Sequence, residues 1–290
     1  DDLNSGHNVR STVFVETRAM YLPDGPEEMK PVGEVEFVQG LAAAAATGLY
    51  GPAKAAASIV GHANLNLGEG VAPVLEALQA ASPQRFRGIR HGLTWDDDPR
   101  IANNSYGLKD QMPDENFRAG ARVLARMGLT FDAWMYFPQL PQLVEFAQAV
   151  PDLTIILNHI GGMLRVGPYA NRDDEVIPTW QKSIAEVAKC PNVVVKLGGI
   201  GQPRTGYDWA ARDKPIGSEE LAETMAPYMD YCIQQFGPDR CMIESNFPPD
   251  KVGHSYNILY NAFKRLTKGY SETERMQMFH DTAVWVYRVE

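Results

Sequence analysis

The sequence predicts an α/β fold, a TIM (β/α)8 barrel that forms a single domain over residues 1–290. Two observations predict this fold. Short runs rich in β-branched residues alternate with longer runs of helical spacing along the chain. Several of the short runs end on a polar side chain, as the strands of a parallel barrel do where they build a site. The length also suits one such barrel, which typically has about 250 residues.

The expected elements form about seven units of a strand followed by a helix. The strands are expected at 11–16, 57–62, 86–91, 130–135, 154–159, 192–197 and 241–245. The helices are expected at 31–49, 70–81, 114–127, 140–150, 179–189, 218–236, 256–266 and 271–287. Strands and helices in this order indicate a parallel sheet that is covered by helices on both faces.

Residues that start or stop helices mark several of these boundaries. Gly128 ends the third helix, and Pro141 suits the first turn of the fourth. Ser218 is expected as the N-cap of the sixth. Ser271 and Glu274 have the spacing of a capping box at the start of the last helix.

Composition excludes several classes of partner. The formal net charge is −9 and the pI is about 5.2, so neither nucleic acid nor an anionic membrane is an expected partner. No apolar run approaches the roughly 20 residues of a membrane helix, and the first residues do not resemble a signal peptide. Cys190, Cys232 and Cys241 have no CxxC spacing, which suits a reduced, cytoplasmic protein.

Polar side chains lie at the expected carboxyl ends of successive strands. They are His62, Arg90, His91, Asp132, Trp134, Tyr136, His159, Lys196 and Asn246. Because the carboxyl ends of parallel strands meet at one face of a barrel, this pattern predicts an active site there. Long polar loops at 93–114 and 161–178 follow two of these strands and are expected to line the site.

Each candidate also has a structural interpretation that the sequence leaves open. His62 can be a hydrogen-bonded loop residue, Arg90 a salt-bridge residue, and Lys196 an outward residue whose stem covers a helix. The two aromatic residues can simply fill the barrel mouth. His159 is the strongest candidate, because two glycines that follow it would let a ligand approach closely. The histidines expected to lie outside the site are His7, His254 and His280.

Several segments resemble a known family. They are Ile156–Gly162, Val193–Gly199, Glu244–Lys251 and Phe279–Ala283, and in this order they resemble the amidohydrolase-related (amidohydrolase 2) family. Within it they look most like the TIM-barrel lactone hydrolases, similar to pyrone-dicarboxylate lactonase and to sugar lactonases. The segments Phe86–Arg90 and Phe137–Pro141 fit the same branch. The match extends from about Ser11 to the end of the chain.

The resemblance implies an eight-stranded barrel with a His-x-His pair on the first strand, a His on the sixth and an Asp on the eighth. The sixth-strand position falls on His159 and the eighth on Asn246. The chain contains no His-x-His, and its first strand, at 12–16, matches the family's second. A seven-stranded parallel barrel would leave two exposed edges, so we expect an upstream segment that supplies the missing strand.

Asn246 changes the chemistry that the family implies. An amide takes up no proton near neutral pH and is a poor ligand for a hard cation. The expected general base is therefore His159, with Asp132 or Asp250 as carboxylate candidates. The same change argues against a tight metal centre. We expect no cofactor beyond at most one divalent metal, zinc, with His159 as a ligand if one is bound.

The first functional hypothesis is a hydrolase that opens a lactone or other cyclic ester of a small carboxylated or sugar-derived substrate. His159 activates the attacking water or polarises the carbonyl. Arg90 and His91 stabilise the oxyanion or hold a substrate carboxylate, and Asn246 orients water or substrate. The residues expected to contact substrate are Asp132, Trp134, Tyr136, His62, Lys196, Arg165 and Tyr169, the last two from a loop that closes over the site with Arg172.

Two other classes of function stay open. A metal-dependent decarboxylase of an aromatic or enol acid would need a well-bound divalent metal, which Asn246 and the absent His-x-His do not favour. A barrel that has lost catalysis and serves in binding is favoured by Asn246, but not by the number of polar strand ends. The expected partner is a small-molecule substrate, and a homodimer is the default oligomeric state.

Overall fold

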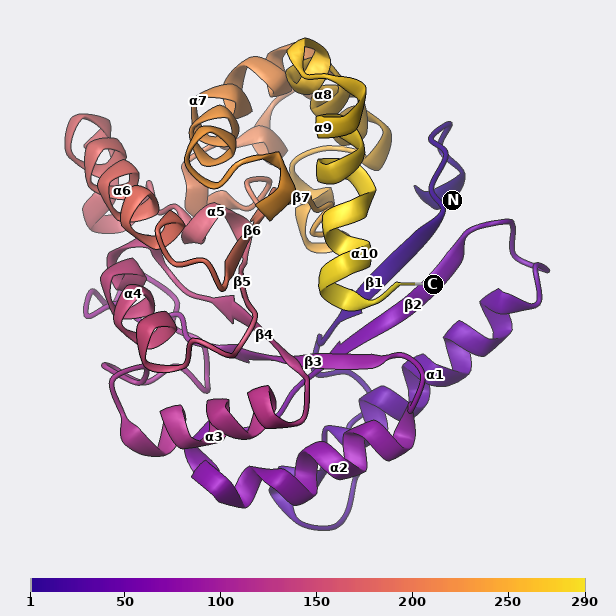
Figure 1. Cartoon of the computed structure of the whole chain (residues 1–290). Helices are drawn as coiled ribbons and strands as arrows, with labels where there is room; N and C mark the ends of the chain where they lie inside the picture. Colours follow the sequence, from indigo (N-terminus) through magenta and orange to yellow (C-terminus); the bar gives the residue numbers. More distant parts are fainter. Residues whose placement is uncertain (1, 290) are drawn as a thin grey trace.

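The computed structural model describes residues 2–289 and shows a curled sheet surrounded by helices (Figure 1). Over this part of the chain the sheet has seven strands, which pair in sequence order. They are β1 (Ser11–Val15), β2 (Lys54–Gly61), β3 (Phe86–Gly92), β4 (Thr130–Trp134), β5 (Ile155–Leu157), β6 (Val193–Leu197) and β7 (Cys241–Ile243). Every neighbouring pair is parallel, so all carboxyl ends lie at one end of the sheet.

Helices cover the outer face of this sheet (Figure 1). Those that follow the strands are α1 (Val32–Ala46), α2 (Ala72–Ala81), α3 (Glu115–Arg126), α4 (Leu140–Ala149), α6 (Asp173–Ala188) and α7 (Ser218–Phe236). After β7 come α8 (Tyr256–Leu266), α9 (Glu272–Met276) and α10 (Thr282–Tyr287). Between residues 2 and 289 no pairing joins β1 to β7, so the sheet is a half-barrel of the TIM type. The predicted α/β class is confirmed.

The main core lies between the sheet and its outer helices. Phe117 of α3, Phe131 of β4 and Phe146 of α4 are fully buried, with ring centroids 5.6 to 6.0 Å apart. Such tilted aromatic pairs add about 0.5–1.5 kcal/mol each beyond the burial of their area. The buried Trp180 of α6 donates its indole N–H to the carbonyl of Ile160 at 2.8 Å. The core thus fixes the backs of the strands and the turn that follows β5.

A second, smaller apolar cluster fills the inner face of the sheet. Its inward-pointing strand residues are Val60, Ile156, Val194 and Met242. They pack against Val286 and Tyr287 of α10. Ser58 Oγ on β2 donates to the carbonyl of Tyr287 at 2.8 Å. The helix α10 therefore lies against the inside of the half-barrel, between the β7 and β1 edges (Figure 1).

Most predicted elements are confirmed near their expected positions, and the helices predicted at 218–236 and 256–266 have those bounds. The predicted loop 161–178 is wrong at its far end, because α6 already starts at Asp173 and contains Pro178. An acidic first turn stabilises a helix N-terminus and outweighs the missing N–H of this proline.

Two predicted helix caps had different outcomes. Ser218 is not an N-cap: Gly217 holds that position, and the Ser218 hydroxyl accepts a hydrogen bond from Arg265 Nε at 3.1 Å. The capping box is confirmed, since the Ser271 hydroxyl accepts from the Glu274 N–H at 3.3 Å and the Ser271 N–H donates back to the Glu274 carboxylate at 2.8 Å. In residues 2–289, no helix is long and apolar enough to cross a membrane.

Candidate functional site

A histidine–glutamate pair joins the ends of β5 and β7. His159 and Glu244 are both largely buried. The His159 ring nitrogen Nδ1 lies 2.5 Å from Glu244 Oε1, which also accepts the His159 backbone N–H at 3.0 Å. Because a carboxylate oxygen only accepts, Nδ1 carries the ring proton and Nε2 keeps a lone pair.

Burial and hydrogen bonding set the charges of this pair. Burial lowers the pKa of His159, and the charge of Glu244 opposes that effect. Burial alone would raise the pKa of Glu244, but the contacts with His159 and the nearby charge of Lys196 outweigh it and hold this pKa below its usual range. Near neutral pH the pair is therefore a carboxylate and a neutral imidazole, which is the state of a general base oriented by an acid.

His159 sits in a strained turn, α5 (His159–Gly162). The four residues have φ angles of 54°, 49°, 78° and 66°. This left-handed conformation is costly for a β-branched residue such as Ile160 and natural for glycine. A Cβ on Gly162 would lie 1.9 Å from the carbonyl oxygen of Met135. The two glycines therefore form the turn that positions His159, and the ligand approach that the sequence suggested for them stays a prediction.

A polar network around Asp132 lies inside the half-barrel. One Asp132 oxygen, Oδ1, accepts from Lys196 Nζ at 2.5 Å, from Asn158 Nδ2 at 3.0 Å and from the Tyr287 hydroxyl at 2.9 Å. Its other oxygen has no partner in residues 2–289. Asp132 is fully buried and Lys196 nearly so. The alternative in which Lys196 points outward is thus wrong.

Arg90 and His62 lie at the ends of β3 and β2. Arg90 Nε donates to Glu16 Oε1 at 2.8 Å, and Nη2 donates to the Glu16 carbonyl at 2.7 Å. His62 Nδ1 donates to the carbonyl of Arg90 at 3.0 Å, and its ring stacks on Tyr106 with 4.4 Å between centroids. Burial lowers the pKa of His62 to about 4. The positive charge of Arg90 also contributes to the lowered pKa of His159.

His91 and Asn246, two predicted catalytic residues, make their contacts outside the histidine–glutamate pair. His91 is fully buried, accepts the Leu65 N–H at Nδ1 at 3.4 Å and packs edge-to-face on Phe117. Burial lowers the pKa of His91 to about 3. Asn246 Nδ2 donates to Asp250 Oδ1 at 2.6 Å. The contacts of His91 and Asn246 therefore lie apart from His159 and Glu244, and a catalytic role of either residue stays a prediction.

An aromatic and cationic stack lies beside His159. The Trp134 ring is edge-to-face with the His159 ring at 4.6 Å and with Tyr136 at 5.9 Å. The guanidinium of Arg204 lies over Trp134, with Cζ 4.6 Å from the ring centroid. Its Nη2 donates to the Gly199 carbonyl at 3.0 Å. Arg204 comes from the loop after β6 and was not expected from the sequence.

Hydrogen bonds tie the predicted loops to each other. The Tyr169 hydroxyl donates to Asp96 Oδ2 at 2.6 Å, which joins the segment after β5 to the segment after β3. Arg165 Nε donates to Asp173 Oδ1 at 2.8 Å. Arg172 pairs with Glu175 one turn further along. These contacts position the loops, and a direct contact of Arg165 or Tyr169 with substrate stays a prediction.

Four residues of the site were missed in the sequence. They are Glu16, Asn158, Arg204 and Glu244. Three of them directly follow the last residue of a strand in the structure and lie within the expected strands 11–16, 154–159 and 241–245. A search of every polar residue at the ends of those expected strands would have included them. Arg204 lies in a loop several residues beyond β6 and has no such signal.

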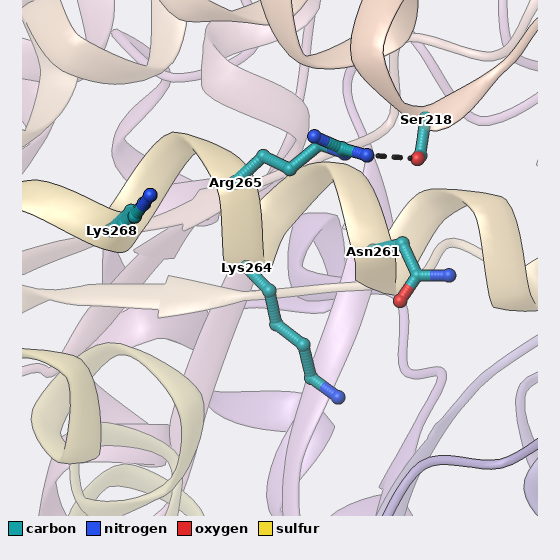
Figure 2. Close-up of a pocket in the computed structure, with 5 residues that line it drawn as sticks. All are labelled: Ser218, Asn261, Lys264, Arg265 and Lys268. Atoms are coloured by element: carbon teal, nitrogen blue, oxygen red, sulfur yellow. Dashed lines mark hydrogen bonds between the residues drawn. The ribbon is translucent and has the colours of Figure 1, made fainter.

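A surface hollow of about 390 Å³ lies elsewhere, where α7 begins beside α8 (Figure 2). It is lined by Ser218, Asn261, Lys264, Arg265 and Lys268. Figure 2 shows the three cationic side chains extending in different directions. Arg265 donates to Ser218, and Lys264 Nζ lies 2.8 Å from a ring nitrogen of His7. Cations that do not converge form no shared binding site, so this hollow is not a candidate.

Parallel strands curled into a half-barrel, with acid–base side chains at their carboxyl ends, place the protein in the class of TIM-barrel-like α/β proteins. The chain belongs to the amidohydrolase family, whose profile matches residues 7–289. This membership supports a hydrolase, and it confirms the resemblance carried by the sequence motifs.

The proteins similar to the chain include curated relatives and solved structures. It is 33% identical to the uncharacterized protein y4mH of Sinorhizobium fredii, over 94% of this chain and 80% of that protein. It is 26% identical to the L-fucono-1,5-lactonase of Burkholderia multivorans, over 70% of this chain and only 63% of that protein.

A zinc-bound amidohydrolase from B. multivorans superposes with a TM-score of 0.70 at 23% identity, covering 89% of this chain and 79% of that one. A 2,6-dihydroxybenzoate decarboxylase from Rhizobium gives 0.55 at 10% identity, covering 99% and 86%. At these identities the structures show the fold alone.

Amidohydrolases typically use a metal ion, but the residues of this site do not fit one as they are arranged here. Across residues 2–289 no group of three or more His, Cys, Asp or Glu side chains could hold a metal ion. The His159 ring is bonded directly to Glu244, and Asp132 is neutralised by Lys196. A zinc ion with His159 as a ligand therefore stays a prediction.

Proposed function

We propose that the protein is a hydrolase that opens a lactone or another cyclic ester, with His159 as its general base. The observation that carries the proposal is the pair of His159 and Glu244, which holds a neutral imidazole in the tautomer that accepts a proton at Nε2. Within residues 2–289, Nε2 has no hydrogen-bond partner. The similarity to L-fucono-1,5-lactonase supports a lactone as the substrate.

In the proposed reaction one proton moves twice. His159 Nε2 takes a proton from water as the water oxygen bonds to the lactone carbonyl carbon, and the carbonyl electron pair moves onto its oxygen. The carboxylate of Glu244 stabilises the imidazolium that forms. The tetrahedral intermediate then loses its ring C–O bond, and His159 returns the proton to the leaving alkoxide. The product is the open-chain hydroxy acid, which is the lactone plus one water.

The negative oxygen of the intermediate needs a positive neighbour. We assign Arg90 to this role, because it is fixed by two hydrogen bonds to Glu16 and its charge already acts on His159. Trp134, edge-to-face with His159, offers an apolar wall for the ring of the substrate. Contacts of substrate with the remaining predicted residues stay predictions. They are His62, Asp132, Tyr136 and Lys196.

Replacement of the base tests the proposal. We expect His159→Gln to lower kcat for lactone opening by about 10²- to 10⁴-fold, the usual size of general-base catalysis. Glu244→Gln keeps an acceptor for Nδ1 but cannot neutralise the imidazolium, so its loss of kcat should be smaller. The measurement is acid release from a panel of 1,4- and 1,5-lactones in a pH-stat. His280→Gln, at an exposed residue, is the matched control and should keep full activity.

Each contrary result has a definite meaning. A fully active His159→Gln variant would remove this residue as the base. A wild-type protein that opens no lactone but releases CO₂ from aromatic acids, with a stoichiometric metal by elemental analysis, would establish the decarboxylase alternative. Lactone binding without turnover would favour the binding barrel.

A further inference from the structure

Arg204 differs from the other two cations of the site in its partners. The other two, Arg90 and Lys196, are each ion-paired with a carboxylate, at 2.8 and 2.5 Å respectively. Arg204 has no carboxylate partner in the part of the chain that the structure describes, and its polar contact is the Nη2 bond to the Gly199 carbonyl. Its Nε is buried without an acceptor. The guanidinium therefore has more N–H donors than the protein satisfies.

The stack on Trp134 leaves these donors usable. The Arg204 guanidinium lies over the face of the Trp134 ring, with Cζ 4.6 Å from the ring centroid. The N–H groups of a guanidinium lie in its plane, so stacking does not occupy them. Nη1 has no acceptor among residues 2–289. A planar fork with open N–H groups matches the two oxygens of a carboxylate.

No carboxylate among residues 2–289 takes this place. Burial lowers the pKa of Arg204, and the charge of Asp250 is the largest influence that opposes the lowering. Asp250 is committed elsewhere: it accepts from the Gly201 N–H at 3.0 Å, from Gln202 Nε2 at 3.1 Å and from Asn246 Nδ2 at 2.6 Å. A desolvated cation without a carboxylate partner is costly, which is a common sign of a site for an anionic ligand.

The segment that carries Arg204 is held rigidly. The Thr205 hydroxyl contacts the carbonyls of Ile200 at 2.9 Å and Gln202 at 2.8 Å. The Arg165 N–H donates to the Arg204 carbonyl at 2.9 Å. A cation fixed before the ligand arrives loses little conformational entropy on binding.

Arg204 is also close to the reacting centre. The Trp134 ring contacts Arg204 on its face and His159 edge-to-face, both at 4.6 Å. A lactone ring that packs on Trp134 beside His159 therefore brings its substituents to Arg204.

We propose that Arg204, stacked on Trp134, receives a carboxylate of the substrate, so that the preferred substrates are anionic lactones. This inference rests on the proposed function, because it names the substrate class of the same site. A neutral lactone would leave Arg204 unpaired, whereas a lactone that bears a carboxylate next to its ring would pair with it. Arg204 is thus a specificity-determining residue.

The test compares two lactones of the same size. The five-membered 5-oxotetrahydrofuran-2-carboxylate carries a negative charge, and its 2-carboxamide is neutral. We expect the wild-type protein to prefer the carboxylate in kcat/KM by roughly 10- to 100-fold, as a hydrogen-bonded charge predicts. Arg204→Met should lose this preference mainly through KM for the carboxylate, with the carboxamide little changed. Arg204→Lys, which keeps the charge without the fork, should be intermediate.

A binding measurement separates this inference from the proposed function. Glutarate, which has no lactone bond, should bind the wild-type protein in calorimetry and bind Arg204→Met roughly 10- to 100-fold more weakly. Arg212→Met, at an exposed arginine paired with Glu220, is the control and should match the wild type. Equal hydrolysis of both lactones, or a preference that survives in Arg204→Met, would overturn the inference. Glutarate bound by Arg204 without lactone turnover would uphold the anion site and reject the lactonase.

Discussion

Single buried residues control the charge of this site. Burial lowers the pKa of His62 to about 4 and of His91 to about 3, so both rings are neutral in the folded protein near neutral pH. In the unfolded chain a histidine titrates near 6.5. Below about pH 6.5 the unfolded state therefore binds protons that the folded state does not, and stability falls as the pH falls.

The free energy of unfolding should record this difference. Each neutral buried histidine makes stability decrease by up to roughly 1.4 kcal/mol per pH unit between about pH 6.5 and its folded pKa. In urea unfolding at pH 7.5 and pH 5.0, the loss of stability should be smaller for His62→Gln than for the parent. An unchanged difference between the two pH values would show that His62 becomes charged in the folded state.

The sequence identifies residues at this scale better than it identifies their partners. His159 was predictable because it follows an apolar strand at the end where parallel strands gather. Its partner Glu244 lies 85 positions away, and no local pattern links the two. Arg90 was predictable by the same rule, but its ion pair with Glu16 was only an open alternative. Arg204 was missed because its position depends on the course of a loop.

At the scale of elements, two backbone segments position the catalytic pair. The turn α5 holds His159 with a positive φ, and Gly199 after β6 passes directly beside it. A Cβ on Gly199 would lie 2.4 Å from His159 Nδ1, and Gly199 itself has a φ of 73°. Two independent constraints therefore require glycine here.

Gly199→Ala should displace the His159 ring from Glu244. We expect kcat to fall by at least tenfold and the free energy of unfolding to drop by about 1–3 kcal/mol, because strain and a close contact act together. Gly40→Ala is the matched control. Gly40 lies inside α1 with open space around it, so alanine should raise stability by about 0.5–1 kcal/mol and leave activity intact. Lactone assays and urea unfolding measure both, and a fully active Gly199→Ala would contradict the constraint.

Periodicity predicted the elements well where helices run without interruption, as in α7 and α8. It failed at Pro178, because a proline can either end a helix or lie within one. Pro178 was taken as a helix boundary but lies within α6. The predicted last helix contains a π-helical segment, Gln277–Asp281, between α9 and α10. A change in hydrogen-bond register of this kind leaves no mark on the spacing of apolar residues.

At the scale of the whole molecule, α10 closes the inside of the half-barrel. Its Tyr287 is almost fully buried, donates to Asp132 and packs among strand residues from both halves of the sheet. The sequence showed an ordinary helical pattern at this end of the chain and gave no sign that it enters the sheet. The class and strand order followed from local patterns, whereas this contact joins residues 155 positions apart.

Tyr287→Phe removes one of the three hydrogen bonds to Asp132 and little volume. We expect the free energy of unfolding to fall by about 1–3 kcal/mol, since a buried carboxylate loses a donor. Tyr50→Phe, at a residue that is 74% exposed, should stay within about 0.5 kcal/mol of the parent. Urea unfolding checks both, and equal effects would mean that the Asp132 network carries no stability.

The place of α10 also orders events in time. Tyr287 meets Ser58 across 229 positions of chain, so the inside of the sheet stays open to water until residues near 287 have been made and have docked. Until then Val60, Ile156 and Val194 of the inner face are accessible to other chains, as is the ion pair of Lys196 and Asp132. Contacts this distant in sequence form late and slowly. A ribosome that pauses before the residues near 287 emerge would therefore hold an almost complete sheet whose apolar inner face is uncovered, which is the stage at which a chaperone has most to protect.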